Sequence, residues 1–443
     1  MQYIQENDED SFAPFLLLGL LANYNKFEFQ NPYQNRLEDF VNESAMNHMV
    51  YGIGKIFSHI RDSYVAVQDD MPEGWNLSST LTFIGLRSLS PDPKSKRVPP
   101  TEEEARDLFN ALPTLEASIG LPTYSFVQAN KLFASILATI AAKPKAETPF
   151  AAFLSLTSYL THHAHRSPRS THYALLNLLS LRIMVEDQVL VKRLCSGEIM
   201  ISVRLCRQRA PYLPHIAIDR IPASATLDIC TDTISHNLRR RLDVHLFSLA
   251  IGLILRIVSH LGQSKTRLQH HWSYLWGALM SFVRFLTQYS TDFAHHGHIR
   301  DQVSLPLTNV IAYCLSTGDS FLPDPGSYDD LFYKLIETGP TLSKFRAAYF
   351  ATAKDGQDRS INVLMSVTTH YHDLLQVQHG KKVHQSPAAV QAIIKQGYET
   401  LDIESNEDLG QWGKWREINR KVELKRVIRT AVEDSRKFAE SSS

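Results

Sequence analysis

The sequence predicts an all-α protein built from stacked antiparallel helix pairs, and three features predict it. Apolar residues recur at helical spacing along nearly the whole chain. No segment repeats the period-two alternation of a half-buried strand, which argues against a sheet-based enzyme fold. The breaks between helical segments are mostly short, as they are between neighbouring helices of helical arrays.

The clearest helix is expected at 266–290. Its polar or small residues form one narrow stripe, stepping by three and four positions, and apolar residues fill the remainder. A helix with so narrow a polar stripe must be covered on most sides by other helices. Trp272 and Trp276 lie one turn apart on its apolar side. We therefore expect both tryptophans in the structural core.

The preceding segment, 246–261, has the same pattern, and the break at 262–264 suits an antiparallel helix hairpin. Helix pairs of roughly 40 residues are typical of armadillo- or HEAT-like solenoids, here with degenerate repeats. The other helices are expected at 12–24, 36–67, 126–142, 150–163, 173–194, 227–238, 303–315, 328–337, 361–376, 388–401 and 409–438.

Three regions follow from these patterns. Residues 1–195 are expected to form N-terminal helical repeats with a proline-rich surface loop near 90–100. Residues 196–225 lack clean helical period and are interpreted as an irregular connection, with a short strand at 199–205 as an option. Residues 226–443 are expected to form a C-terminal armadillo-like domain. Its last helix, charged on most faces, is expected to be long and exposed.

Composition narrows the class of function. The chain has 46 basic and 46 acidic residues, so no bulk affinity for nucleic acid is expected. Its four cysteines show no zinc-ligand spacing and are interpreted as buried thiols of a reducing compartment. The longest uninterrupted apolar runs, 15–22 and 249–255, are shorter than the ~18 residues that a membrane span needs. Any membrane role is therefore expected to be peripheral.

Histidines cluster in three places, at 162–165, 295–298 and 370–372. None of the clusters has a cysteine or carboxylate at the turn or helical spacing typical of metal sites, and HExxH is absent. Each cluster falls at an expected helix end, where imidazoles can meet free carbonyls or face water. The sequence therefore predicts no metal ligands and no cofactor.

Catalytic motifs are also missing. The GIGK run at 52–55 lacks the glycine spacing, the upstream strand and the Ser/Thr of a phosphate loop, so tight helix packing explains it better. There is no GxSxG nucleophile elbow and no kinase or deaminase signature. We predict a non-enzymatic protein with no catalytic residues, and an enzyme with an unrecognised site remains an alternative.

A basic stretch runs between Leu238 and Trp272. It holds six basic residues against one acid, Asp243. One interpretation is cations placed favourably at a helix C-terminus and solvated. The other is a docking patch for an acidic partner or an anionic membrane surface. The residues assigned to this docking patch are Arg239, Arg240, Arg241, Lys265 and Arg267.

Several runs resemble the armadillo-like helical domain-containing protein 3 family. Residues 237–246 (NLRRRLDVHL), 267–279 (RLQHHWSYLWGAL) and 318–333 (GDSFLPDPGSYDDLFY) resemble its C-terminal region. Residues 20–33 (LLANYNKFEFQNPY) and 39–43 (DFVNE) resemble the middle of family members. The likeness is weak at 70–225 and beyond 380. Family members are longer and this chain begins near their midpoint, so an N-terminal half is expected to lie outside it.

The resemblance implies a cytosolic armadillo-like scaffold, without catalytic activity, that is recruited peripherally to Golgi membranes. It implies association with the type III beta phosphatidylinositol 4-kinase and with the large Arf exchange factor of the early Golgi. Such a scaffold would support Golgi maintenance and secretion. The alternative is a generic helical-repeat adaptor, for instance in nuclear transport. No short binding motif of the family transfers to particular residues here.

Overall fold

The structure is a computed structural model, and it describes residues 12–24, 31–68, 102–144, 146–206, 219–238, 243–293, 298–351, 359–379, 387–397 and 420–441. These residues form helices joined by short connections, which confirms the predicted all-α, armadillo-like fold. They divide into two compact units. Unit 1 comprises residues 1–190, 199–220 and 419–443, and unit 2 comprises residues 191–198 and 221–418.

Unit 1 is a stack of helices from both ends of the chain. Helix α4 packs against α9, and α10 packs against α7 and α9. Its helices are α2 (Phe12–Asn23), α3 (Pro32–Glu38), α4 (Glu43–Gln68), α6 (Glu102–Asn110), the 3-10 turn η2 (Leu115–Ile119), α7 (Gly120–Ala129), α8 (Lys131–Thr139), α9 (Pro149–His162), α10 (Pro168–Glu186) and α21 (Lys421–Ser441). Helix α11 (Gln188–Cys195) crosses the boundary between the units.

Aromatic rings from three helices fill one part of the unit 1 core. Phe126 of α7 lies between Phe15 of α2 and Phe133 of α8, with ring centroids 5.6 Å and 4.7 Å away. All three side chains are buried. Stacked and tilted aromatic pairs at this distance add to the stability gained from burial.

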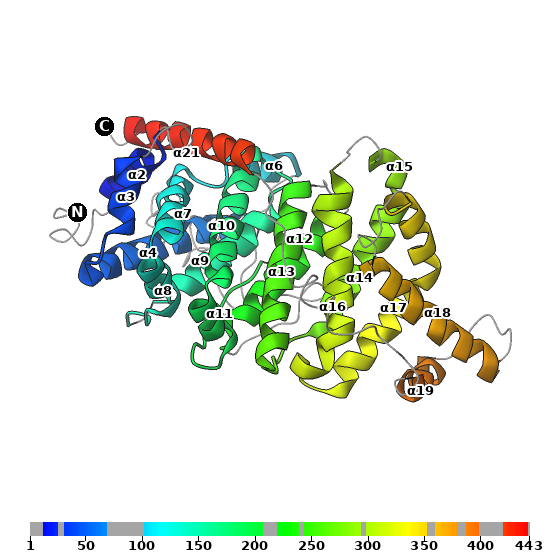
Figure 1. The fold of residues 1–443 in the computed structure, drawn as a ribbon. Coiled ribbons are helices and arrows are strands. Elements are labelled where there is room, and N and C mark those ends of the chain that lie inside the picture. Colours follow the sequence, from blue (N-terminus) through cyan, green and yellow to red (C-terminus); the bar gives the residue numbers. More distant parts are fainter. Residues whose placement is uncertain are drawn as a thin grey trace, which may run out of the picture. The chain divides into compact units, whose positions relative to one another are not determined.

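Unit 2 is also a stack of helices, which are coloured from green to orange in Figure 1. Helix α12 packs against both α13 and α14, α13 packs against α16, and α14 packs against α17. The helices are α12 (Pro222–Asn237), α13 (Val244–Ser264), α14 (Trp272–Gln288), α15 (Ser290–Phe293), the π-helical turn η3 (Arg300–Ser304), α16 (Leu305–Phe321), α17 (Pro325–Tyr349), α18 (Arg359–His379) and α19 (Pro387–Gly397).

The hairpin expected between 246–261 and 266–290 takes a different form. Helices α13 and α14 touch through Phe247 and Phe282, whose ring centroids lie 4.8 Å apart. Their main partners are other helices, because α12 packs against both of them. The apolar face of each helix is wider than one neighbour can cover, so it is shared among several.

Helix α13 is long and apolar enough to cross a membrane, by length and composition alone. The expectation that no segment reaches this length was wrong, because it counted uninterrupted apolar residues and stopped at single polar positions. The most apolar window of α13 is 78% buried among other helices. Burial of this extent is what the central helix of a helical array requires.

Three expected helices are each divided in two, at a residue whose side chain caps the second helix. Asn42 accepts a hydrogen bond from the Ala45 amide before α4. Asp187 accepts from the Leu190 amide before α11. Asn130 caps α8 by accepting from the Phe133 amide, and its own amide group donates to the carbonyls of Leu37 and Phe40. The expected helices at 36–67, 126–142 and 173–194 were therefore too long.

Helix α17 shows the opposite difference, because it runs to Tyr349 and not to 337 as expected. The sequence signal for an end was Gly339–Pro340, yet Pro340 lies inside the helix. An interior proline costs about 3 kcal/mol or more. Leu335, Leu342 and Phe345 are fully buried on either side of the proline, and this burial offsets the cost.

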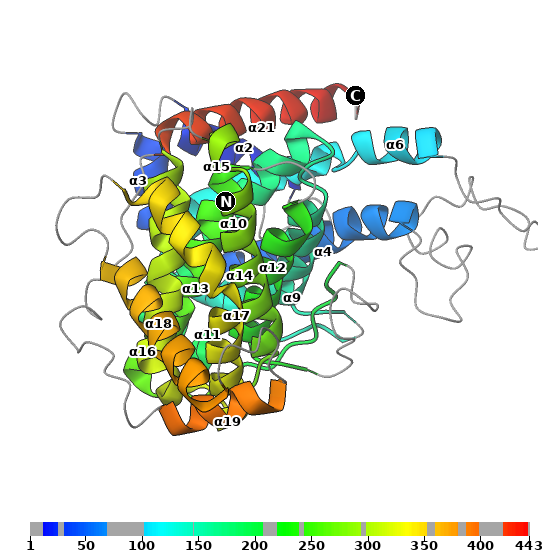
Figure 2. The same ribbon diagram turned by 90° about the vertical axis from the view of Figure 1, so that its right-hand side faces the viewer.

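The final helix, α21, is long and mostly exposed as expected, but one stripe of it is buried. Val427, Ala431 and Asp434 are buried, and α21 packs against η2 and α10 of unit 1. It lies beside α2 in Figures 1 and 2, where the Phe12 and Phe438 rings are 4.7 Å apart. The expected domain 226–443 therefore loses its last helix to the N-terminal unit.

The stretch 199–206 belongs to unit 1 and is extended. Among the described residues it forms one antiparallel bridge and no strand: Ile201 and Arg220 exchange backbone hydrogen bonds of 3.0 Å. Ile201, Val203 and Leu205 are buried. The proline-rich loop at 90–100 and most of 206–218 lie outside the described residues.

Candidate functional site

The proposed docking patch is only partly described. Arg239, Arg240 and Arg241 lie outside the described residues. Lys265 and Arg267 are exposed on the connection between α13 and α14. Lys265 ends α13 in the left-handed conformation, with φ of 52°. One guanidinium nitrogen of Arg267 donates to the Leu322 carbonyl, so this side chain also helps hold the connection in place.

Trp272 and Trp276 are both buried in unit 2, with exposed fractions of 1% and 0%. Their rings stack with centroids 5.3 Å apart, and Trp272 also contacts Phe321 of α16. The Trp276 indole N–H donates to the Ser327 carbonyl at 3.1 Å. The pair therefore joins α14 to the N-terminal end of α17.

Two of the three histidine clusters do not gather ligands. His295 and His296 lie outside the described residues, and His298 is exposed. His372 is exposed and contacts Gln376 one turn later, while His370 packs edge-on against Tyr371. Within the described part of the chain, neither cluster belongs to a group of three side chains that could hold a metal ion.

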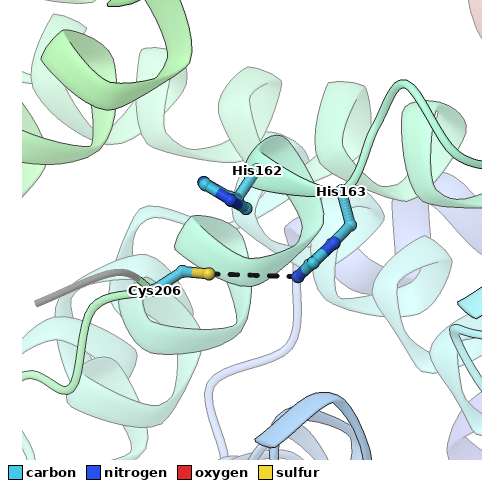
Figure 3. Close-up of side chains that lie close together, drawn as sticks. All are labelled: His162, His163 and Cys206. Carbon is cyan, nitrogen blue, oxygen red and sulfur yellow. Dashed lines mark hydrogen bonds between the residues drawn. The ribbon is translucent and has the colours of Figure 1, made fainter. Parts of the chain in front are cut away.

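The third cluster differs, because the fold adds a cysteine to it. His162, His163 and Cys206 place their ligand atoms within 4.8 Å of one another. The Cys206 Sγ atom lies 3.9 Å from His163 Nε2. All three residues are buried, with exposed fractions of 5%, 2% and 0%. The sulfur and the two imidazole rings gather at the end of α9 (Figure 3).

Local structure fixes both sides of this group. Helix α9 begins at Thr148–Pro149, where the threonine hydroxyl caps the Ala151 amide, and it ends at His162 with His163 as the capping residue. The extended stretch 201–206 runs along α9. Ser155 donates to the Arg204 carbonyl, and Ser158 accepts from the Cys206 amide at 3.0 Å.

The His163 ring is held in a stack of aromatic side chains. It lies parallel to the rings of Tyr64 and Phe109, with centroids 5.1 Å and 4.7 Å away and interplanar angles of 12° and 22°. The His162 ring meets it edge-on at 5.0 Å. The Tyr64 hydroxyl is in turn bonded to Ser170 of α10 at 2.7 Å. The orientation of His163 is therefore set by packing.

His162 and His163 lie at a helix end, as expected, but both are buried and do not face water. The proximity of Cys206 was not expected, because it lies in the connection, 43 positions away from His163. One signal was present in the sequence: Ile201, Val203 and Leu205 alternate with the polar residues Ser202 and Arg204, which indicates that one side of this stretch packs against the core. No spacing rule could have indicated which helix end it reaches.

A second polar cluster lies in unit 2. The Ser224 hydroxyl is 3.0 Å from His270 Nδ1, and His270 Nε2 is 3.9 Å from Asp228 Oδ1. A nucleophile with a general base needs hydrogen-bond distances and a hydroxyl that substrate can reach. The Asp228 distance is too long, and Ser224 is only 6% exposed. This cluster ties the 266–271 connection to α12 and is a packing contact.

The other three cysteines are free and buried. Burial raises the pKa of the Cys195 thiol to about 12 and raises the pKa values of Cys230 and Cys314 as well. These thiols are therefore protonated at physiological pH and poor nucleophiles. They act as small apolar side chains in the core.

Comparison with known proteins gives a consistent answer. A family model described as "Armadillo-like helical domain-containing protein 3, C-terminal" matches residues 220–437. A Schizosaccharomyces pombe protein named "UPF0588 membrane protein C20F10.02c" is 28% identical over 427 residues, covering 96% of this chain and 67% of that protein. The human armadillo-like helical domain-containing protein 3 is 22% identical, again covering 96% and 67%. Its Danio rerio counterpart is 21% identical, covering 98% and 68%.

No solved structure matches the chain. The chain spans about two-thirds of the length of these relatives. The alignments run through both units, and the family model extends over α12 to α19 and most of α21. Residues 220–437 therefore belong to the C-terminal domain of the armadillo-like helical domain-containing protein 3 family, and nearly the whole chain aligns with members of that family.

Proposed function

We propose that this chain is a non-enzymatic scaffold that recruits or positions a phosphatidylinositol 4-kinase and an Arf exchange factor at the Golgi. In this role it supports Golgi maintenance and secretion. The observation that carries the proposal is the alignment of 96% of the chain with the human armadillo-like helical domain-containing protein 3. The kinase is of the type III beta class and the exchange factor is the large one of the early Golgi, as the family resemblance implies.

The architecture supports a binding role. Stacked helices present extended side surfaces, and the side chains on those surfaces can vary without loss of the core. The buried polar clusters at His163 and at His270 are covered by packing, so neither offers an open catalytic cleft. A scaffold acts through its surface, and the exposed residues are therefore where partners would bind.

Membrane association in this proposal is peripheral and the resting location is the cytosol. The Schizosaccharomyces pombe relative is named a membrane protein. Helix α13 has the composition of a membrane span, but it is covered by other helices of unit 2. Contact with a membrane would then use surface cations, and each lysine or arginine near an anionic leaflet contributes about 1 kcal/mol. The docking patch Arg239, Arg240, Arg241, Lys265 and Arg267 supplies such cations.

The test is a charge reversal of Arg239, Arg240 and Arg241 to Glu in cells. If the docking patch recruits the chain, the variant should lose its Golgi localisation and should recover less kinase and exchange factor in affinity purification. The matched control reverses Lys344, Arg346 and Lys395, three exposed basic residues of unit 2 that lie outside the docking patch. The control should keep both properties.

Two results would contradict parts of the proposal. If a folded patch variant localises as the wild type does, the three arginines are solvated surface residues and do not recruit the chain. Wild-type purifications that contain nuclear transport factors, and neither the kinase nor the exchange factor, would favour the alternative of a generic adaptor. Melting temperature measured on all three proteins shows whether the charge reversal has altered folding.

A further inference from the structure

We propose that His162, His163 and Cys206 bind a zinc ion, which fastens the extended stretch 201–206 to the C-terminal end of α9. The donor set is two imidazole nitrogens and one sulfur, the ligands that zinc prefers in proteins. The group contains no carboxylate, and oxygen ligands are what calcium and magnesium require. The ligand chemistry therefore selects a borderline-soft transition metal.

The distances between the donors are close to those of a metal site. Zinc binds nitrogen at about 2.0–2.1 Å and sulfur at about 2.3 Å, so tetrahedral ligands lie about 3.3–3.6 Å from one another. The Cys206 Sγ atom and His163 Nε2 are 3.9 Å apart, and all three ligand atoms lie within 4.8 Å. The Cys206–His163 distance would shorten by a few tenths of an ångström, and the widest separation in the group by up to about 1.5 Å, to complete the geometry.

The surroundings hold the donors in place before any ion binds. The His163 ring is clamped between Tyr64 and Phe109, and the Cys206 backbone is bonded to Ser158 of α9. Ligands that are fixed by packing lose little freedom on binding, and contacts that orient the ligands raise the affinity for the metal. A buried cluster with this many restraints differs from surface histidines that happen to be neighbours.

The helix itself favours a cation here. His162 is the last residue of α9, a helix of 14 residues, and the carbonyl groups of its final turn carry partial negative charge. Binding would deprotonate the Cys206 thiol, and the released proton would leave to solvent. The zinc ion carries two positive charges, so one thiolate and the helix end together reduce the net charge that is buried.

Three protein ligands leave the fourth tetrahedral position open to water. The main consequence is structural, since the ion would join the end of α9 to a segment 43 positions later. A free energy of metal binding is then also a free energy of folding for this part of unit 1. The site is independent of the proposed scaffold function, and its test needs no partner protein.

The first experiment measures zinc by elemental analysis in the full chain, after expression with added zinc and gel filtration in metal-free buffer. The wild type should carry one equivalent, and Cys206→Ser and His162→Gln should each lose it. The variant Cys195→Ala/Cys230→Ala/Cys314→Ala, which keeps Cys206 as the single cysteine of the chain, should retain it. Circular dichroism reports whether each variant is folded.

The second experiment uses cobalt(II) in place of zinc on the wild-type chain, so it does not depend on a variant that folds poorly. Tetrahedral coordination with a thiolate should give intense visible bands and a near-ultraviolet thiolate-to-cobalt band, and both should persist in the single-cysteine variant. If the wild-type chain binds neither zinc nor cobalt, the proposal is wrong, and Cys206 and His163 form only a thiol–imidazole contact. Zinc retained in Cys206→Ser, or copper(I) bound in its place, would also overturn it.

Discussion

Tyr173 donates its hydroxyl group to the Asp434 carboxylate at 2.7 Å, joining α10 to α21 across 261 positions of sequence. The same carboxylate oxygen accepts from Arg169 Nε at 3.0 Å. One turn away, the His172 ring contacts the Thr430 hydroxyl at 2.8 Å. Asp434 is buried, so these contacts replace the water that its carboxylate would lose on folding. They explain how a highly charged final helix becomes part of unit 1.

The Tyr173–Asp434 bond should contribute measurably to stability. Tyr173→Phe keeps the ring and removes only the hydroxyl group, and hydrogen bonds to charged groups contribute about 1.5–3 kcal/mol. We expect a loss of this size in the free energy of unfolding, measured by urea denaturation. Tyr33→Phe, at an exposed position, serves as control and should change it by less than about 0.5 kcal/mol. Equal effects in the two variants would contradict this account.

Trp276 should be a major contributor to the core of unit 2. Trp276→Ala removes a fully buried ring that stacks on Trp272 and also breaks the bond to the Ser327 carbonyl. Truncation of such a residue costs about 3–5 kcal/mol through lost burial and the cavity left behind. Chemical denaturation should show this loss. The control is Tyr274→Ala on the same helix, a residue that is half exposed, and a comparable loss there would show that burial is not the cause.

Lys265 is held in a conformation that suits glycine. A residue with a side chain costs about 1–2 kcal/mol in the left-handed region, and glycine adds about 0.4–1 kcal/mol of backbone entropy to the unfolded chain. With φ of 52°, Lys265→Gly should therefore raise the free energy of unfolding by about 0.5–1 kcal/mol. Lys265→Ala removes the same charge but keeps Cβ, so it should be nearly neutral. Thermal melting of the two variants shows whether the backbone conformation or the charge of Lys265 determines the change in stability.

His59 and Glu116 form a pair whose effect should depend on pH. Their hydrogen bond, 3.1 Å long, raises the pKa of His59 above 6.5 and lowers the pKa of Glu116 below 4.5, although partial burial opposes both shifts. The histidine's stabilisation is complete below pH 6.5 and is lost as pH rises through its folded pKa. That of the glutamate is complete above pH 4.5 and is lost as pH falls through its folded pKa.

The stabilising contributions of His59 and Glu116 are therefore both complete between pH 4.5 and 6.5. His59→Gln should therefore lower the melting temperature most near the middle of this interval and progressively less as pH rises above it. His48→Gln is the control, because the hydrogen bond of its ring is to the Ser44 carbonyl. If the difference in melting temperature between His59→Gln and the wild type stays constant up to alkaline pH, the His59–Glu116 pair is not ionic.

The sequence alone determined the class of structure. Helical spacing of apolar residues reports the face that each helix buries, and the narrow polar stripe on 266–290 was enough to place Trp272 and Trp276 in a core. The runs at 237–246, 267–279 and 318–333 were enough to indicate the family. These inferences succeed because periodicity and family-specific residues are local properties of the chain.

Helix ends were decided by contacts that are not local. Asn130 stops one helix and starts another, and its amide group donates to the carbonyls of Leu37 and Phe40, more than 80 positions earlier. An asparagine within an apolar pattern reads equally well as a surface residue or as a cap. Pro340 shows the reverse, since burial of its neighbours keeps α17 continuous where the sequence indicates an end.

Only the tertiary structure decided which segments meet. Helical periodicity identifies an apolar face but not its partner, so the sequence did not indicate that the stripe of α21 with Val427 and Asp434 packs against other helices of unit 1. For the same reason the His162–His163 pair had no third ligand in the sequence. The fold brings Cys206 to it from 43 positions away, because the apolar alternation of 201–205 packs that stretch along α9.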